Sequence, residues 1–323
     1  MKRVIFDTDI GIDDAMALLF LHYAEGVQIE AISTVAGNAS LTNVTRNALH
    51  VCERFGIDAP VFRGAAGPMA PALTKDHADF VHGANGLGNI EFHEPARSAE
   101  TLPAAQAIVE LAQAHSGQLS IVAVGRLTNL AAAVALCPEL PSLIGELVVM
   151  GGVFHRNNHR GNVSPVAEAN MAGDPSAADR VLGAGFNATI VGLDVTQNTI
   201  MDEAFIDELR RTAGDAGAFI SAITRFYFDF YASLSGHRAC PIHDSSAVAC
   251  LLAPELYTRE TGVVRVADAG VAMGQTIFGD EPERYASDAW RDRSPCRICT
   301  AVDADAVKAL YLRTLARAGT ARA

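Results

Sequence analysis

The sequence predicts a single α/β domain, residues 1–323, in which helices cover both faces of an open, mostly parallel sheet. Strand-like and helix-like patterns alternate through the first two hundred residues, which is the order of repeated βαβ units. Half of the 323 residues are hydrophobic, enough for a large core. No repeat, low-complexity block or linker divides the chain. One domain is therefore expected.

The individual elements are predicted from the periodicity of the apolar residues and from the residues typical of helix and strand ends. Runs of apolar and β-branched residues predict strands at 4–6, 28–35, 60–63, 119–124, 146–150 and 188–195. Helices are expected between them over 15–21, 40–55, 103–115, 127–136 and 175–182. Ser40 suits a helix N-cap and Gly56 a helix end. The remainder is expected to be mostly helical over 202–233, β-rich over 262–266 and 271–277, and helical over 304–316. This order predicts a Rossmann-like sheet with an added, mostly helical C-terminal part.

The composition excludes some classes of partner. A net charge of −12 argues against nucleic-acid binding, because neutralising phosphates requires a basic face. No block of Lys and Arg suggests an anionic membrane surface. The apolar run near the N-terminus is interrupted by Asp7 and is too short for a signal peptide, and the uncharged stretch 127–138 is far below a membrane span. We expect no membrane partner and a cytoplasmic location.

The six cysteines do not suggest a disulfide framework in a chain of this length. Four of them lie among apolar residues and are interpreted as small core residues: Cys52, Cys137, Cys240 and Cys250. Cys296 and Cys299 have the spacing of a redox or zinc pair. Because no second such pair or His pair accompanies them, we interpret them as core residues too.

Four carboxylates fall within eight residues directly after the first predicted strand. They are Asp7, Asp9, Asp13 and Asp14. Helix capping accounts for one or two of them, but not for four. Like charges this close repel one another unless a cation or a hydrogen-bonded ligand compensates them, and a hard divalent ion with oxygen ligands is the natural choice. The turn lies at the carboxyl end of a strand, where open α/β sheets bind ligands. We therefore predict the active site there.

Other polar clusters also follow predicted strands, and a parallel sheet brings such ends to one edge. These clusters are Asn38, the stretch 125–129, the stretch 150–152, and Asp194 with Thr196 and Gln197. Three further candidates lie in loops or at helix starts: 82–88, 161–174 and the pair His243-Asp244. Each has a plainer interpretation: Asn38 as a turn residue, Glu168 and Asn170 as a solvated loop, and His243 as a structural histidine.

Common nucleotide and hydrolase motifs are missing. The sequence contains no GxGxxG after a strand and no GxxxxGK[ST], which argues against dinucleotide and P-loop sites. It also contains no GxSxG, which argues against a serine hydrolase.

Taken together, these segments resemble the nucleoside hydrolases, the inosine-uridine-preferring N-ribohydrolase family. Residues 7–15 resemble the family's DxDxGxDDA signature, and 127–131 resemble its LTN segment. The stretch 161–170, followed by Asp174-Pro175, is similar to its ribose-binding segment. The match begins at Asp7, continues through 35–38 and 82–88, and ends at His243-Asp244, so it covers nearly the whole chain.

The resemblance implies one bound Ca²⁺. Carried over, Asp9, Asp14 and Asp244 supply carboxylate oxygens and Thr128 its backbone carbonyl, an all-oxygen set that suits a hard cation. Metal binding acidifies a bound water, and Asp9 would be the general base. The reaction implied is hydrolysis of the N-glycosidic bond of inosine- or uridine-type ribonucleosides to ribose and free base, as in purine and pyrimidine salvage. Family members are commonly dimers or tetramers, so a homo-oligomer is expected.

The same resemblance assigns the substrate contacts. Asp13, Asn38, Asn162, Glu168 and Asn170 match the groups that hold the ribose, and Met150 ends a neighbouring strand. Acids around the ribose stabilise the oxocarbenium character that develops as the bond breaks. His243 matches the general acid, an imidazole expected near its working pKa. His82, Tyr227 and Tyr231 are expected near the base, although core packing is an equal interpretation for the two tyrosines.

Three positions depart from the family pattern. Arg126 stands where Pro is usual, Ala169 replaces Phe, and Asn85 replaces Asp. None belongs to the metal set, so hydrolysis is still expected, but the preferred base is left open. A purine pocket with a stacked Trp is disfavoured, because the only Trp is Trp290, far along the chain from the motifs.

Two other classes of protein remain as alternatives. A haloacid-dehalogenase-type phosphatase also carries Asp-x-Asp after a strand, but it requires Thr or Val where this chain has Gly11, and it leaves Asp13 and Asp14 unexplained. A calcium-containing nucleoside-binding protein without turnover would need the pocket but not both a base and an acid.

Overall fold

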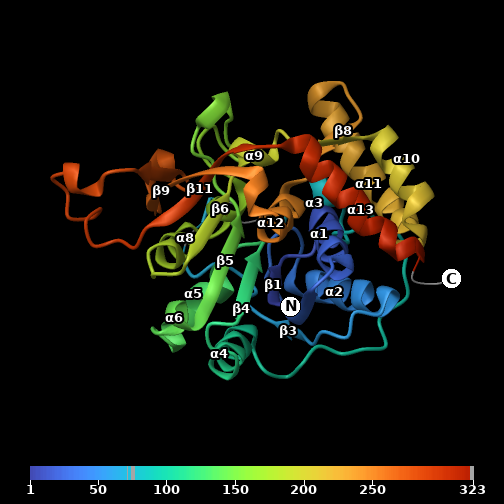
Figure 1. Ribbon diagram of the computed structural model, residues 1–323, viewed down its shortest axis with the longest axis horizontal. Coiled ribbons are helices and arrows are strands. Elements are labelled where there is room, and N and C mark those ends of the chain that lie inside the picture. Colours follow the sequence, from blue (N-terminus) through green and yellow to red (C-terminus); the bar gives the residue numbers. More distant parts are fainter. Residues whose placement is uncertain (71, 74–76, 321–323) are drawn as a thin grey trace.

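A mixed, mostly parallel sheet of nine strands forms the centre of the protein in the computed structural model, which describes residues 1–70, 72, 73 and 77–320 (Figure 1). Its strand order is β10-β9-β11-β6-β5-β4-β1-β2-β3. The strands are β1 (Lys2–Thr8), β2 (Val27–Thr34), β3 (Val61–Arg63), β4 (Leu119–Ala123), β5 (Ile144–Met150), β6 (Ala188–Val191), β9 (Tyr257–Val266), β10 (Thr276–Gly279) and β11 (Cys296–Val302). Strands β1 to β6 are parallel, and β9 runs antiparallel to both β10 and β11.

Thirteen α-helices connect and cover the strands within the described residues. The longer ones are α1 (Ile12–Tyr23), α2 (Leu41–Phe55), α4 (Ala104–Ala114), α5 (Thr128–Leu136), α8 (Pro175–Leu182), α10 (Glu203–Thr212), α11 (Gly214–Ser235), α12 (His243–Leu252) and α13 (Ala304–Thr320). The short ones are α3 (Asp79–His82), α6 (Leu140–Leu143), α7 (Ala169–Gly173) and α9 (Leu193–Thr196). A separate pair of strands, β7 (Ile200–Asp202) and β8 (Ala239–Pro241), brackets α10 and α11.

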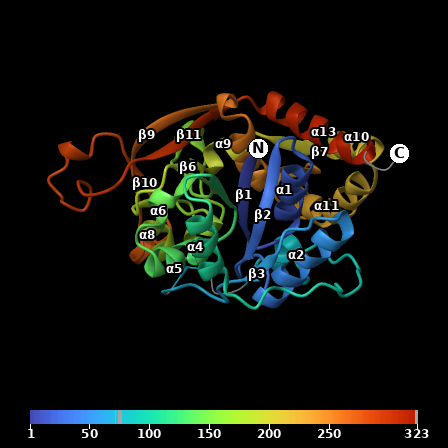
Figure 2. The same cartoon turned by 60° about the horizontal axis from the view of Figure 1, so that its bottom comes forward.

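The two faces of the sheet bury separate hydrophobic cores. Side chains that alternate along β1 point to opposite faces, so Val4 and Phe6 belong to one core and Ile5 to the other. The first core packs under α1, α2, α11, α12 and α13, and the second under α4, α5 and α8. Figure 2 shows the two groups of helices on either side of β1 and β2. The predicted α/β fold with helices on both faces is confirmed.

Local signals in the sequence fix several helix ends. The Ser40 hydroxyl accepts a hydrogen bond from the Asn43 backbone N–H and so caps α2, as predicted. Gly56 ends the same helix in the left-handed conformation, at φ 67°. Pro103, expected in the first turn of the helix over 103–115, is instead the N-cap of α4, one residue before the helix begins at Ala104.

Two predicted β segments are wrong in detail, and one strand was not predicted. The strand expected over 188–195 ends at Val191, and residues 193–196 form the helical turn α9, with Gly192 as its N-cap. Residues 270–272 form a 3₁₀ turn, so β10 begins only at Thr276. The strand β11, which was not predicted, inserts between β6 and β9.

The position of β11 explains the Cys-x-x-Cys spacing. Residues three apart on a strand point to opposite faces, so Cys296 and Cys299 cannot act as a pair. Cys296 belongs to the core under α8, and Cys299 lies in the other core, with its Sγ 4.0 Å from Cys250 Sγ. Both thiols are free and buried.

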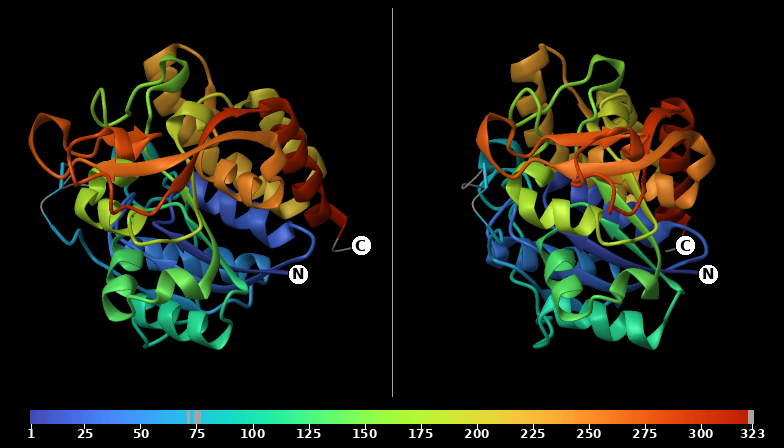
Figure 3. Two further views of the ribbon diagram at one scale, coloured as in Figure 1. Left: turned by 60° about the vertical axis from the view of Figure 1, so that its left-hand side comes forward. Right: turned by 90° about the vertical axis from the view of Figure 1, so that its left-hand side faces the viewer.

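At the far end of the sheet from α2, the chain after β9 extends outward as an arm (Figure 3). It contains β10 and the loop that returns to β11. None of the described helices is both long and apolar enough to span a lipid bilayer.

Candidate active site

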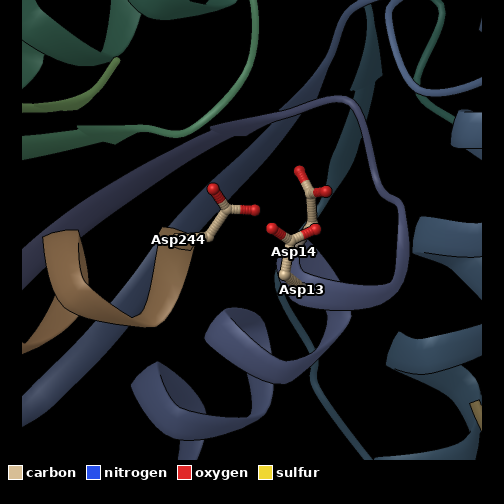
Figure 4. A group of neighbouring side chains, drawn as sticks. All are labelled: Asp13, Asp14 and Asp244. Carbon is tan, nitrogen blue, oxygen red and sulfur yellow. The ribbon is translucent and has the colours of Figure 1, made fainter. Parts of the chain in front are cut away.

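Three carboxylates from two helices meet beyond the carboxyl end of β1. Asp13 and Asp14 lie in the first turn of α1, and Asp244 lies in the first turn of α12. Their ligand oxygens all lie within 4.8 Å of one another. Figure 4 shows the three side chains pointing toward a shared space. The predicted convergence of the first and last motifs of the sequence is therefore found in the structure.

Asp9 and Asp14 are held by groups from the neighbouring strand ends. The Asn38 backbone N–H donates to Asp9 Oδ2 at 2.8 Å, and the Asn38 side-chain amide donates to Asp14 Oδ2 at 2.9 Å. Asp14 also accepts from Thr8 Oγ1 at 2.6 Å and from the Gly11 backbone N–H at 2.8 Å. Helix capping is thus one role of Asp14. Gly37 is required beside Asp9, because a Cβ there would overlap Asp9 Oδ2.

Two carboxylate oxygens in the group have no hydrogen-bond partner among the described residues. They are Oδ1 of Asp9 and Oδ1 of Asp13, both fully shielded from solvent. A buried carboxylate oxygen without a donor is costly, and a cation is the compensation that this set of oxygens can accept. The residues therefore fit a hard divalent ion such as Ca²⁺.

Burial raises the pKa of every carboxyl in the group. It raises the pKa of Asp9 and of Asp244 well above the usual range, and the charges of Asp14 near Asp9 and of Asp13 near Asp244 raise them further. The pKa of Asp13 rises to about 6, again mainly through burial. Without a compensating cation, the group cannot all be ionised at neutral pH.

Thr128, the remaining predicted metal ligand, is the first residue of α5 and is buried. Its hydroxyl donates to Asp174 Oδ2 at 2.7 Å and not to the acidic group. Asp174 also accepts from the Met69 and Ala177 backbone N–H groups, and it caps α8. The hydroxyl of Thr128 is therefore committed to joining α5 and α8, and metal ligation by its carbonyl stays a prediction.

A cavity of about 560 Å³ opens above the acidic group. Most of the predicted site residues line it: Asp9, Asp13, Asn38, His82, Met150, Asn162, Glu168, Asn170, Tyr227, Tyr231 and His243. Asp14, Thr128 and Asp244 are buried but do not line it. The strand ends, the 161–170 loop and helix α11 thus converge on one space.

The 161–170 loop forms one wall of the cavity. The Glu168 carboxylate accepts from the backbone N–H groups of Gly152, Asn170 and Met171, which fixes it as the N-cap of α7. At 2% exposure Glu168 is not part of a solvated loop, so that plainer interpretation is wrong for this residue. The Asn162 side-chain carbonyl accepts from the Ala169 backbone N–H at 3.0 Å and ties the loop to α7.

Asn170 connects that wall to the sheet. Its side-chain N–H₂ donates to the carbonyls of Val124 and Met150, at the ends of β4 and β5. Ala169 also lines the cavity, so the replacement of the bulkier residue of the family pattern removes volume from this wall. Asn85 has a different role: its side chain bonds to the backbone of Leu87, Asn89 and Ile90 and shapes its own loop.

The opposite wall comes from α11 and the start of α12. Tyr227 donates its hydroxyl to Asp13 Oδ2 at 3.1 Å, and the Tyr231 hydroxyl lies 3.1 Å from His243 Nε2. Both tyrosines therefore lie in the site, although Tyr227 is also 2% exposed and packed in the core. The other ring nitrogen of His243, Nδ1, lies 2.8 Å from Thr196 Oγ1.

Both histidines of the site are neutral at pH 7 in this structure. Burial lowers the pKa of His243 to about 4, with a further contribution from His82, so its imidazole does not lie near its working pKa as the sequence suggested. Burial also lowers the pKa of His82 to about 4. His82 Nδ1 accepts from the Ile12 backbone N–H at 3.1 Å, which leaves the proton of the neutral ring on Nε2.

Several cavity residues were not predicted. Most are apolar or aromatic side chains around the mouth, together with one polar residue, His77: Leu73, His77, Phe80, Val81, Phe230 and Leu234. Gln197, which belongs to a predicted polar cluster, also lines the cavity. Phe80 and Leu234 are each 69% exposed, which is unusual for large hydrophobic residues, and the Phe80 and Phe230 rings pack edge to face with centroids 5.7 Å apart. The concentration of aromatic residues over 226–231 was the available signal.

Buried carboxylates at the carboxyl edge of an α/β sheet face two neutral histidines and several aromatic side chains across one cavity. This combination of acids, histidines and cavity is typical of an enzyme that acts on a small polar molecule. The comparisons make the class specific. The family model described as "Inosine-uridine preferring nucleoside hydrolase" matches residues 4–309. The chain belongs to this family and is a nucleoside hydrolase, which overturns both the phosphatase and the binding-only alternatives.

Relatives match over nearly the full length. The chain is 36% identical to "Uridine nucleosidase 1" of Arabidopsis thaliana, over 95% of this chain and 90% of that protein. It is 37% identical to "Non-specific ribonucleoside hydrolase RihC" of Escherichia coli, over 87% of this chain and 89% of that protein. The solved structure titled "Plant nucleoside hydrolase - PpNRh1 enzyme" superposes with a TM-score of 0.93 at 34% identity, covering 98% of this chain and 99% of that one. These matches show ribonucleoside hydrolase activity.

Proposed function

We propose that this hydrolase cleaves the N-glycosidic bond of inosine- or uridine-type ribonucleosides, depends on Ca²⁺, and releases ribose and free base. The observation that carries the proposal is the buried group of Asp13, Asp14 and Asp244, whose oxygens lie within 4.8 Å of one another beneath an open cavity. The uridine nucleosidases among the relatives and the family description support the substrate class.

In the proposal, Asp9, Asp14, Asp244 and the carbonyl of Thr128 hold the ion. A bound Ca²⁺ would compensate the carboxylate charges and lower the pKa of a water in contact with it. Asp9 is the general base. Its carboxylate lines the cavity and is oriented by the Asn38 backbone N–H, which donates to Oδ2, so it is placed to take the proton of the attacking water.

The ribose lies between the acidic group and the 161–170 loop. Asp13 at the start of α1 and Asn38 after β2 line one side, and Asn162, Glu168 and Asn170 line the other, with Met150 at the end of β5. The carboxylates of Asp13 and Glu168 accept hydrogen bonds from sugar hydroxyls, and their negative charge stabilises the oxocarbenium character of the transition state. Direct attack by water, without a covalent glycosyl-enzyme, completes the reaction.

The base lies against α11, and the Tyr231–His243 pair protonates it. Tyr231 gives its hydroxyl proton to the departing base and regains one from the protonated imidazole at Nε2, 3.1 Å away. With a pKa of about 4, roughly one His243 in a thousand is protonated at pH 7, but that form is a strong acid. His82 and Tyr227 border the same space, with ring centroids 5.6 Å apart.

The decisive experiment is reducing-sugar release from inosine, uridine, cytidine and adenosine, with and without a chelator. Chelator-sensitive release of ribose, restored by calcium, is the expected result, with inosine or uridine preferred. Release that survives complete removal of divalent metal would refute the calcium dependence, and preference for adenosine would refute the substrate class.

We also propose a homo-oligomer of two or four copies, which rests on the resemblance, and a cytoplasmic location, which rests on the composition. Light scattering measures the number of copies.

A further inference from the structure

Arg126 is a buried cation that forms no hydrogen bond or close ion pair with the described residues, although its charge opposes the rise in the pKa of Asp9. It follows β4, is only 8% exposed, and lines the active-site cavity. Its side chain lies against Gly173 at the end of α7, where any Cβ would overlap its Nε and Cδ. Among the described residues, none forms a hydrogen bond or an ion pair with it. A guanidinium in this state is uncommon, because a buried charge is normally satisfied by a partner.

The sugar side of the cavity contains many acceptors and few free donors. Asp9, Asp13 and Glu168 present carboxylate oxygens. The amide N–H₂ of Asn170 is committed to the Val124 and Met150 carbonyls, and that of Asn38 donates to Asp14. A ribose hydroxyl also needs donors for its oxygen lone pairs. The five N–H groups of Arg126 are the largest uncommitted donor set on this wall.

The charge of the surroundings decides which ligand chemistry suits Arg126. The cavity floor and walls carry Asp9, Asp13 and Glu168, and Asp14 and Asp244 lie just beneath. A phosphate dianion would be repelled by these carboxylates, even with one guanidinium beside it. A neutral hydroxyl meets no such repulsion.

We propose that Arg126 is a specificity-determining residue that donates hydrogen bonds to one hydroxyl of the ribose. The inference rests on the proposed function, since it assumes that ribose occupies this end of the cavity. It assigns a substrate contact to a position where the family pattern has proline, a residue that has no side-chain donor.

The contact acts on binding and not on bond cleavage. The transition state develops positive charge on the ribose, so a nearby guanidinium gives it no preferential stabilisation over the bound substrate. Removing Arg126 should therefore raise KM and weaken ribose binding as much as nucleoside binding, with a smaller effect on kcat that comes from the loss of its charge near Asp9.

The test compares Arg126→Met, Arg126→Gln and, as a surface control, Arg210→Met on α10. Each variant is assayed with uridine and with its 2′-, 3′- and 5′-deoxy analogues, as substrates or as competitive inhibitors, with calcium present. We expect Arg126→Met to raise the KM for uridine roughly 10- to 100-fold, the size expected for a lost charged hydrogen bond. The penalty for deleting one particular hydroxyl should disappear in this variant, Arg126→Gln should lie between, and Arg210→Met should match the wild type.

Binding of ribose alone, measured by calorimetry or as a rise in melting temperature, separates this inference from the proposed function. If the wild type turns over no nucleoside but binds ribose through Arg126, the proposed function fails and the contact stands. Equal losses for uridine and all three analogues would overturn the inference, as would unchanged ribose binding in Arg126→Met. A loss confined to uridine 5′-monophosphate would overturn it in favour of an anion site.

Discussion

The hydroxyl of Tyr231 lies 3.1 Å from Nε2 of His243, and the same ring is held at Nδ1 by the Thr196 hydroxyl, 2.8 Å away. The two residues are 12 positions apart in the sequence, on α11 and α12. This arrangement orients the imidazole and joins it to the phenol, and both residues line the cavity, so proton transfer to a leaving base has a defined route.

The first prediction concerns this route. His243→Ala and Tyr231→Phe should each lower kcat/KM for inosine and uridine by about 10²- to 10⁴-fold, the range for a lost general acid. A nitrophenyl riboside, whose leaving group needs no proton, should lose less than about tenfold. The comparison of substrates is the measurement, and equal losses on both would remove the pair from the acid role.

The second prediction concerns the general base. Asp9→Asn should reduce turnover by at least about 10³-fold, because the amide cannot accept the proton of water. Folding should be retained, since Asn38 can still donate to the side-chain oxygen. Steady-state kinetics and thermal unfolding measure the two effects separately.

Asp7→Asn is the matched control for that change. Asp7 Oδ1 accepts from Ser33 Oγ at 2.5 Å and from the Asn129 side-chain amide at 2.8 Å, behind the cavity wall. An asparagine can keep its Oδ1 on both donors, but its N–H₂ then takes the buried place of Oδ2, which has no partner among the described residues, so this variant should lose stability, by about 1–3 kcal/mol. If Asp7→Asn abolished activity with unchanged stability while Asp9→Asn remained active, the two assignments would have to be exchanged.

The sequence predicted the sheet and the convergence of its motifs well, and for a physical reason. Alternation of strand and helix signals fixes a parallel sheet, and a parallel sheet places Asp9, Asn38 and Met150 at one edge. Strand β11 was not predicted, because its pairing with β6 and β9 is non-local and its residues are ordinary in composition.

The protonation states could not be read from the sequence. Nothing in the pair His243-Asp244 reveals that burial lowers the pKa of the imidazole to about 4, because burial depends on helices contributed by distant segments. The exposure of a side chain also depends on distant segments. Hydrophobicity alone predicts Phe80 and Leu234 as core residues, so their exposed positions at the mouth of the cavity were missed.

The third prediction concerns the ion. Asp244→Asn should weaken calcium binding by about 10- to 100-fold, because it removes one charged ligand from a group whose oxygens lie within 4.8 Å. Calorimetric titration of the metal-free protein with calcium measures it. The exposed Asp202→Asn, at the start of α10, is the control and should bind like the wild type. Equal calcium affinity of Asp244→Asn and the wild type would place the ion elsewhere.

The fourth prediction follows from the raised pKa values of the buried carboxyls. Asp9 and Asp244 keep their protons in the folded metal-free protein to a pH well above the value at which the unfolded chain loses them. The folded state then binds more protons than the unfolded state, so the free energy of unfolding falls as the pH rises through the folded pKa. His82 and His243, whose pKa values burial lowers to about 4, have the opposite effect, but only between about pH 4 and 6.5.

Above about pH 6.5 the histidines are neutral in both states, so the carboxyl effect stands alone. The melting temperature of the metal-free protein should therefore fall between about pH 6.5 and 8.5. Saturating calcium should remove this slope, because the ion binds the ionised carboxylates of the folded state and stabilises it more at higher pH. Differential scanning fluorimetry across this range, with chelator or with calcium, measures both curves. Parallel curves would mean that calcium does not bind at these carboxylates, and a metal-free melting temperature that rises with pH would contradict their raised pKa values.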